Sequence, residues 1–214
     1  MNSEVKGRIV RSYSKIFRNK DYGFIREEDM PNSGYIYNSL PNLDQIEWLT
    51  TGETSHLADN HCGAVTTTNM IIYYLNSSEG QKVTKLKSFD VFEQVHKFVG
   101  NGPVPRLSGK VRKIFHRYYK PVVHKRLRKS YEIKEAIDEG KIITLLLMAN
   151  LFDWHWVLCV GYREYFNGDF YLEVIDAWHN KGKRFYKFKS QAFLVSAVAY
   201  DLGEGYEKNV NNSV

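Results

Sequence analysis

The second half of the chain contains five successive segments rich in β-branched and aromatic residues, and this succession limits the fold more than any other feature. The segments cover residues 141–150, 155–164, 170–178, 183–189 and 193–202. Such a composition is typical of β-strands. The Asn167-Gly168 dipeptide between the second and third segments favours a tight hairpin. We therefore expect a mainly antiparallel sheet in the C-terminal half.

The first half shows helical periodicity instead. Residues 62–76 carry apolar or small side chains three and four positions apart, which marks one face of a helix. A second helix is expected over residues 88–98, with Ser88 as its cap, and a third over residues 131–139, ending at Gly140. Helices that come first and an antiparallel sheet that comes later predict an α+β fold.

Length and composition favour one globular domain. The chain has 214 residues, of which 43% are hydrophobic and 14% aromatic, which is enough for a sizeable core. Two cysteines, Cys62 and Cys159, are too few for a disulfide framework. Within a single domain of residues 1–214 we expect an irregular N-terminal region with short strands (1–55), a helical half (56–130), a sheet half (131–202) and a tail (203–214).

Hydropathy along the chain indicates no membrane span. No apolar run approaches the roughly 20 residues that a spanning helix needs. The N-terminus, MNSEVKGRIVRSYSKIF, lacks the apolar core of a signal peptide. The sequence as written therefore predicts a cytoplasmic protein, and a secreted one would require a leader that this sequence does not include.

Positive charge is concentrated in residues 110–129, which hold nine Lys and Arg and no acidic residue. The rest of the chain carries more acidic than basic residues, so the net charge of +6 is a local excess. Three interpretations are open: a solvated face, a binding surface for an acidic substrate or partner, and a nucleic-acid surface. The solvated face is favoured first and nucleic acid last.

Cys62 is the first candidate for chemistry because it opens the helix expected over residues 62–76. Asp59 or Asn60 can cap this helix, which places Cys62 in its first turn. The thiolate is the nucleophilic form, and only a few per cent of an unperturbed thiol is ionised near neutral pH. A helix N-terminus and a nearby imidazolium both favour the thiolate. We therefore expect the pKa of Cys62 to lie below that of a free thiol.

His155 and Asp176 are the candidate partners of Cys62. His155 stands at the start of the most apolar strand segment, between two tryptophans. Asp176 ends the next segment, and antiparallel pairing through the intervening hairpin would bring it beside His155. A third group at this place holds the imidazole in the tautomer that a general base needs. The three residues predict a catalytic triad in which Cys62 is the nucleophile, His155 the base and Asp176 the orienting residue.

Three motifs surround these residues: NHCGAVTTTNMIIYY, WHWVLCVGY and VIDAW. They resemble the nucleophile helix, the histidine strand and the third-residue strand of papain-like cysteine peptidases, especially the bacterial peptidase C39-like group. The likeness covers about residues 45–200. It implies a papain-like (cysteine proteinase) fold, in which N-terminal helices that carry the Cys pack on a C-terminal sheet that carries His and Asp. It further implies a thiol protease that cleaves an amide bond of a peptide substrate through a thioester, with no cofactor and no metal.

The oxyanion donor departs from the family pattern. Papain-like enzymes usually place a Gln a few residues before the Cys, but here His56 stands six positions before Cys62. Gln45 is the only Gln upstream, and Asn60 is a nearer amide. We expect Gln45 to serve if a longer loop brings it to the site, with Asn60 as the alternative.

Other functions fit the same residues. A transglutaminase-like or arylamine acetyltransferase-like acyl transferase would use the same triad and pass the acyl group to an amine instead of water. A catalytically weak binding module would work through the basic residues 110–129. A zinc site at His56, His61 and Cys62 is disfavoured, because four ligands at a recognisable spacing are missing. Three tryptophans, Trp154, Trp156 and Trp178, are expected to be divided between a substrate cleft and the core.

Overall fold

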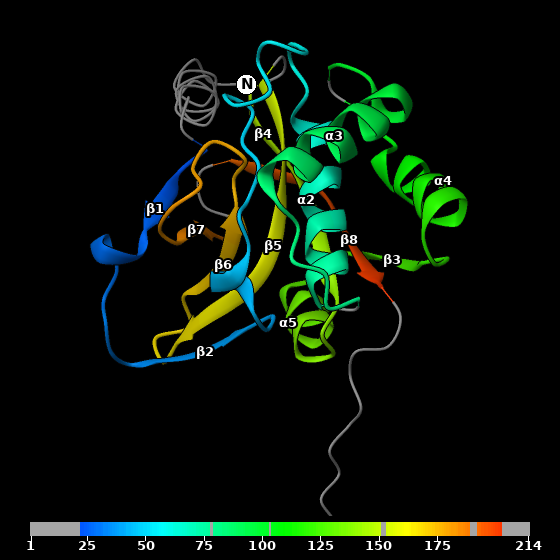
Figure 1. Ribbon diagram of the computed structural model, residues 1–214. Helices are drawn as coiled ribbons and strands as arrows, with labels where there is room; N and C mark the ends of the chain where they lie inside the picture. Colours follow the sequence, from blue (N-terminus) through cyan, green and yellow to red (C-terminus); the bar gives the residue numbers. More distant parts are fainter. Residues whose placement is uncertain (1–21, 78, 103, 151–152, 189–191, 203–214) are drawn as a thin grey trace, which may run out of the picture.

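The computed structural model describes residues 22–77, 79–102, 104–150, 153–188 and 192–202 (Figure 1). This part of the chain forms an α+β fold of four α-helices and one antiparallel sheet of eight strands, which confirms the predicted fold class at that level. The helices are α2 (Cys62–Ser77), α3 (Lys85–Val99), α4 (Leu107–Tyr118) and α5 (Ser130–Asp138). The strands are β1 (Phe24–Arg26), β2 (Tyr35–Ser39), β3 (Val123–Leu127), β4 (Ile142–Asn150), β5 (Asp153–Tyr165), β6 (Phe170–Ile175), β7 (Arg184–Lys187) and β8 (Phe193–Asp201). Two 3₁₀ turns, η1 (Glu27–Asp29) and η2 (Leu43–Gln45), flank β2.

The sheet is organised around its longest strand, β5. The strand order is β1-β7-β6-β5-β4-β8-β3, and every pairing is antiparallel. The first half of β5 pairs with β4, and its second half pairs with β2 along Gly161–Tyr165. The turn between β5 and β6 uses Gly168 with a φ of 89°, a backbone conformation that glycine adopts without strain. The predicted hairpin at Asn167-Gly168 is thereby confirmed.

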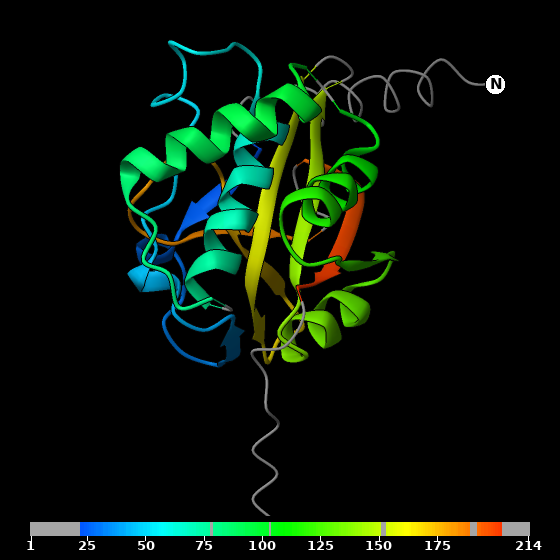
Figure 2. The same ribbon diagram turned by 45° about the vertical axis from the view of Figure 1, so that its right-hand side comes forward.

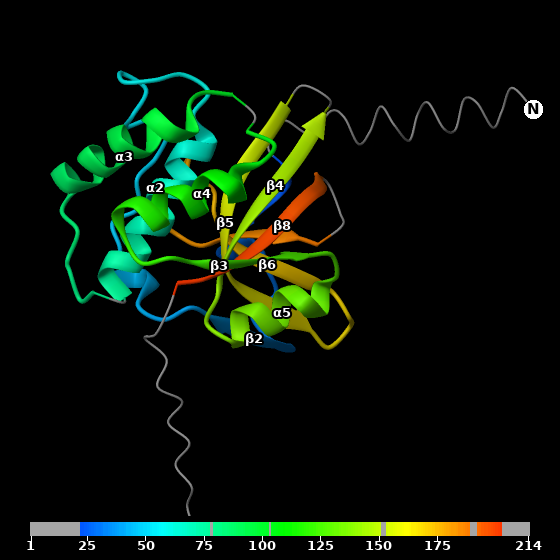
Figure 3. The same cartoon turned by 90° about the vertical axis from the view of Figure 1, so that its right-hand side faces the viewer.

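Helices cover both faces of the sheet (Figures 2 and 3). Figure 3 shows α2, α3 and α4 on one side and α5 on the other. Alternating side chains of β4 face the two layers: Ile142 and Leu146 join the core beneath α2, α3 and α4, while Ile143 and Leu145 join the core beneath α5. This period of two follows from the strand geometry and explains why the strand is apolar throughout.

Helix α2 is the central helix of the larger layer, and its residues Gly63–Leu75 are all buried. It packs on β5, where the Thr66 hydroxyl donates to the Trp156 carbonyl over 2.9 Å. Gly63 lies in the same contact, where a Cβ would be 3.4 Å from Cδ1 of Trp156, an ordinary van der Waals distance. The N-terminal end of α2 is therefore held against the beginning of β5 (Figure 1).

Most of the elements expected from the sequence are present, with altered boundaries. The helices expected over residues 62–76 and 131–139 correspond to α2 and α5. The helix expected over residues 88–98 begins earlier, and its cap is Thr84, whose side chain accepts from the Lys87 N–H, so the prediction of Ser88 as cap is wrong. The strand expected over residues 170–178 ends at Ile175.

The basic residues 110–129 have a definite structure that local sequence patterns did not predict. They contribute most of α4 and the whole of β3, an edge strand that pairs with β8. The irregular region expected over residues 1–55 contains the short strands β1 and β2, whereas residues 1–21 and 203–214 lie outside the described part. No helix in the described ranges has the length and apolarity needed to cross a bilayer.

Candidate active site

A cavity of about 430 Å³ opens where the N-terminal end of α2 meets the start of β5. Both Cys62 and His155 line it, although they lie far apart in the sequence. The approach of α2 to β5 brings these two predicted residues to one space. Asp176 does not line the cavity, but its main-chain carbonyl contacts Nε2 of His155.

Cys62 is the first residue of α2. The first helical hydrogen bond runs from the Val65 N–H to the His61 carbonyl over 3.0 Å, so His61 directly precedes the helix instead of the expected Asp59 or Asn60. Burial raises the pKa of the Cys62 thiol, although the main-chain N–H groups of Trp156 and Gly63 act in the opposite direction. The expectation of a pKa below that of a free thiol is therefore wrong for this cavity.

His155 is buried, and its Nε2 lies 2.6 Å from the main-chain carbonyl oxygen of Asp176. A carbonyl only accepts hydrogen bonds, so Nε2 carries the proton of the neutral ring. The lone pair is then on Nδ1, the atom that a general base would use. The Trp178 ring stacks on the imidazole with centroids 3.9 Å apart and an interplanar angle of 12°. Burial lowers the pKa of His155 to about 4, which keeps the ring neutral near pH 7.

Asp176 follows the last residue of β6 and lies beside His155, as antiparallel pairing predicts. Its carbonyl makes the contact with His155, while its buried carboxylate accepts from the N–H groups of Trp178 and His179, each over 2.9 Å. The same carboxylate lies 2.7 Å from Nδ1 of His179. The carboxylate therefore shapes the turn that carries Trp178, and the main chain of the same residue orients the imidazole.

Within the described residues, no hydrogen bond joins Cys62 to His155. The sulfur atom is approached by the main chain of β5 at Trp156, next to the histidine in the sequence. Catalytic contacts are often long in the free enzyme and tighten when a substrate is bound. The arrangement therefore places a thiol and an imidazole with a free Nδ1 lone pair at one cavity.

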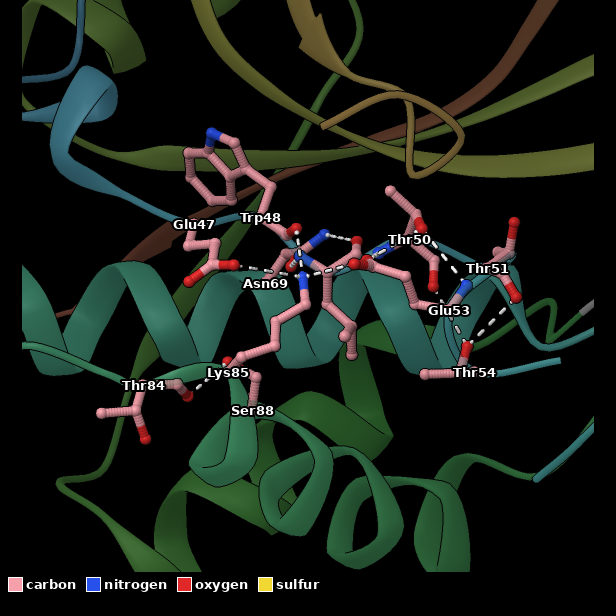
Figure 4. A network of polar contacts seen from close by, with 11 residues as sticks. Glu47, Trp48, Thr50, Thr51, Glu53, Thr54, Asn69, Thr84, Lys85 and Ser88 are labelled. Carbon is pink, nitrogen blue, oxygen red and sulfur yellow. Dashed lines mark hydrogen bonds and ion pairs between the residues drawn. The ribbon is translucent and has the colours of Figure 1, made fainter. Parts of the chain in front are cut away.

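The loop before Cys62 is held in place by a partly buried polar network (Figure 4). The Asn69 amide of α2 makes two hydrogen bonds to the main chain of Leu49, each 2.9 Å long. Lys85 lies 2.7 Å from Glu53 and also donates to the Trp48 carbonyl over 3.3 Å. These contacts replace the backbone pairing that a strand would supply, so that residues 47–54 follow one path along α2.

This loop is also joined to the turn after Asp176. The Thr51 N–H donates to the Ala177 carbonyl over 2.8 Å, and the Thr51 hydroxyl lies 3.2 Å from the same oxygen. Ala177 has a φ of 60°, a left-handed conformation that is costly for a residue with a Cβ. The two contacts compensate for that conformation and tie the segment before Cys62 to the segment that stacks on His155.

The contacts of His61 within the protein are structural. It is buried, its Nε2 lies 2.6 Å from the Thr54 hydroxyl, and its ring packs edge-on against Phe92. No group of three or more His, Cys, Asp or Glu residues in the described ranges is arranged to hold a metal ion. The geometry thus gives no support to a zinc site at His56, His61 and Cys62.

The two candidate oxyanion donors occupy different places. Gln45 is exposed at the end of η2 and does not line the cavity, whereas Asn60 does. Asn60 has a left-handed φ of 50°, and its carbonyl accepts from the Gly102 N–H over 2.6 Å. Of the two amide residues, Asn60 is therefore the one that borders the cavity together with Cys62.

The remaining sequence candidates divide between cavity and core. Trp154 and Trp178 line the cavity, while Trp156 is buried against α2. Cys159 is a fully buried free thiol, and burial raises its pKa to about 12. None of residues 110–129 lines the cavity.

Two further lining residues, Tyr22 and Asp153, were not identified from the sequence. The Tyr22 hydroxyl donates to Oδ1 of Asp153 over 2.6 Å. Asp153 could have been noticed because it comes directly before the Trp-His-Trp triplet. Tyr22 offers no such signal, because only the tertiary fold brings it to β5.

Comparison with protein-family models and with curated proteins finds no match to this chain. The functional assignment below therefore depends on the geometry of the cavity and on the motifs around Cys62, His155 and Asp176.

We expect the buried His155 to make stability depend on pH. Its folded pKa of about 4 lies below the ordinary value of about 6.5, so the unfolded chain binds the proton more tightly. Stability should be complete above pH 6.5 and fall as the pH approaches 4, by about 3 kcal/mol from this residue. Urea unfolding of wild type and His155→Gln at several pH values measures the difference. The exposed His116→Gln is the matched control, and equal pH dependence in wild type and His155→Gln would contradict the assignment of a neutral buried imidazole.

Proposed function

We propose that the protein is a cysteine-dependent hydrolase that cleaves an amide bond, most simply that of a peptide. One observation carries this proposal: a single cavity is lined by a cysteine at a helix N-terminus and by a histidine whose Nε2 is committed to a carbonyl. That commitment leaves Nδ1 as the basic nitrogen. A nucleophile and a base with a defined tautomer at one site constitute the minimum for thiol hydrolysis.

The reaction can be written with these residues alone. Nδ1 of His155 takes the thiol proton as Sγ of Cys62 attacks the substrate carbonyl carbon. The C–N bond breaks, the imidazolium gives its proton to the leaving amine, and a thioester remains on Cys62. A water molecule, deprotonated by His155, then attacks the thioester. The C–S bond breaks, His155 returns its proton to Sγ of Cys62, and the carboxylic acid is released.

The oxyanion that forms in both steps needs donors beside Cys62. The proposed donors are the main-chain N–H of Cys62 at the unpaired start of α2 and the side-chain amide of Asn60. This replaces the earlier expectation for Gln45, whose side chain is exposed outside the cavity.

Asp176 and Trp178 are positioning residues in this scheme. The Asp176 carbonyl holds the imidazole, and its carboxylate holds the turn whose tryptophan covers the ring. An Asp176→Asn variant retains an acceptor for the two N–H groups, so it should lose less activity than Asp176→Ala, which leaves both N–H groups without a partner.

A papain-like fold of the peptidase C39-like kind is the finer part of the proposal. It is supported by the division into helices that carry Cys62 and a sheet that carries His155 and Asp176. An acyl transferase would use the same first step, and the choice between water and an amine as acceptor distinguishes the two. Binding of an acidic partner by the basic residues of α4 and β3, outside the cavity, remains a prediction.

Acylation of Cys62 is the direct test of the proposed function. A peptide-like epoxide or an activated ester should add one acyl or alkyl group per chain, observed as intact mass. The Cys62→Ala and His155→Gln variants should lose at least about a thousandfold in single-turnover hydrolysis, because the pair acts as a unit. The matched control is Cys159→Ala, which removes the buried thiol and should still be labelled. Labelling that persists in Cys62→Ala would refute the mechanism.

The oxyanion assignment gives a second test. Asn60→Ala should lower kcat by about 10²–10³-fold with little change in KM, since the amide would bind charge that develops only in the transition state. Gln45→Ala, an exposed change outside the cavity, is the matched control and should behave as wild type. Equal kcat values for Asn60→Ala and wild type, or a loss confined to Gln45→Ala, would show that Asn60 is not the donor.

A further inference from the structure

Among the described residues, Asp153 sets the charge of the cavity. It is the only carboxylate among the described lining residues, and no Lys or Arg lines the cavity with it. The side chain belongs to the first residue of β5, two positions before His155. A net negative charge next to the reacting groups is unexpected in a chain whose formal net charge is +6.

Asp153 has no cationic partner in the described part of the protein. Its Oδ1 accepts the hydrogen bond of the Tyr22 hydroxyl over 2.6 Å, and its carboxylate takes part in no ion pair within 4.0 Å there. The tyrosine fixes the orientation of the carboxylate without neutralising it. The second oxygen is therefore available to a ligand.

Aromatic rings surround the same space. Tyr22, Trp154 and Trp178 all line the cavity; Trp178 is 40% exposed, whereas Tyr22 is 1% exposed, so the accessible rings are those of the two tryptophans. The Tyr22 and Trp178 rings lie with centroids 5.6 Å apart. Aromatic faces attract ammonium and guanidinium groups, and they also accept the methylene groups that carry these ions.

We propose that this cavity binds a substrate residue with a positively charged side chain, whose ammonium or guanidinium group lies beside Asp153 and against the aromatic rings. The inference rests on the proposed hydrolase function and names the class of substrate for that site: a peptide with Lys or Arg close to the scissile bond. An acidic residue at this position would be repelled by Asp153. The basic residues 110–129, which do not line the cavity, cannot offset that repulsion by direct contact.

The test uses three internally quenched peptides that differ only at every second position. These positions all hold arginine in the first peptide, citrulline in the second and glutamate in the third. Citrulline has the shape of arginine without its charge. Wild type should cleave the arginine peptide with a kcat/KM about tenfold above that for citrulline, and the glutamate peptide should be the poorest substrate. In Asp153→Asn, which retains an acceptor for Tyr22, the ratio of arginine to citrulline should fall close to one. Asp90→Asn, an exposed charge change on α3, is the matched control and should retain the ratio.

Binding is measured separately from cleavage, so that failure of the cation site can be distinguished from failure of the hydrolase function. Agmatine is titrated into Cys62→Ala and into the Cys62→Ala/Asp153→Asn double variant, with tryptophan fluorescence as the readout for Trp154 and Trp178. Asp153-dependent binding of agmatine together with no peptide hydrolysis would overturn the hydrolase and leave the cation site standing. Equal cleavage of all three peptides by wild type, abolished in Cys62→Ala, would overturn the cation site and leave the hydrolase standing.

Discussion

The packing of α2 on β5 is the contact on which the rest of the site depends. Helix α2 begins at Cys62 and β5 begins two residues before His155, so the relative position of the two elements decides where the two side chains meet. The Thr66–Trp156 hydrogen bond fixes this position. A second tie, from Thr51 to Ala177, joins the loop before Cys62 to the turn after Asp176. The segments that border the cavity are thus hydrogen-bonded to one another, in addition to packing on the core.

Burial governs the chemistry of the two reacting groups in opposite directions. It raises the pKa of the Cys62 thiol and lowers the pKa of the His155 imidazole, so both are neutral near pH 7. In the proposed mechanism, proton transfer at the moment of attack would then replace a preformed thiolate–imidazolium pair. Trp178 contributes by covering the imidazole, and Asp176 contributes by fixing its tautomer. The burial that keeps the His155 imidazole neutral should also reduce stability in acid.

Local patterns in the sequence predicted much of this arrangement, and long-range contacts account for what they missed. Spacing of three and four marked α2, and alternation with a hairpin placed Asp176 beside His155. The apolar residues Val111, Ile114 and Phe115 have helical spacing as well. Helix α4 was nevertheless not predicted, because charged residues around these three obscure the apolar pattern. Whether Gln45 or Asn60 borders the cavity depends on the path of the loop before Cys62, which Asn69 of α2 holds at Leu49. The pairing of Tyr22 with Asp153 and the direction of the thiol pKa follow from tertiary packing, which no local pattern encodes.

The coupling between Cys62 and His155 is the central claim, and the pH dependence of Cys62 alkylation tests it most directly. The rate of iodoacetamide reaction at Cys62 would be followed by peptide mass between about pH 5 and 9 in wild type and in His155→Gln. The neutral imidazole should accelerate the wild-type reaction by about tenfold or more near pH 7, since it can accept the thiol proton. Superimposable rate profiles for the two proteins would show that the thiol and the imidazole share a cavity without acting together.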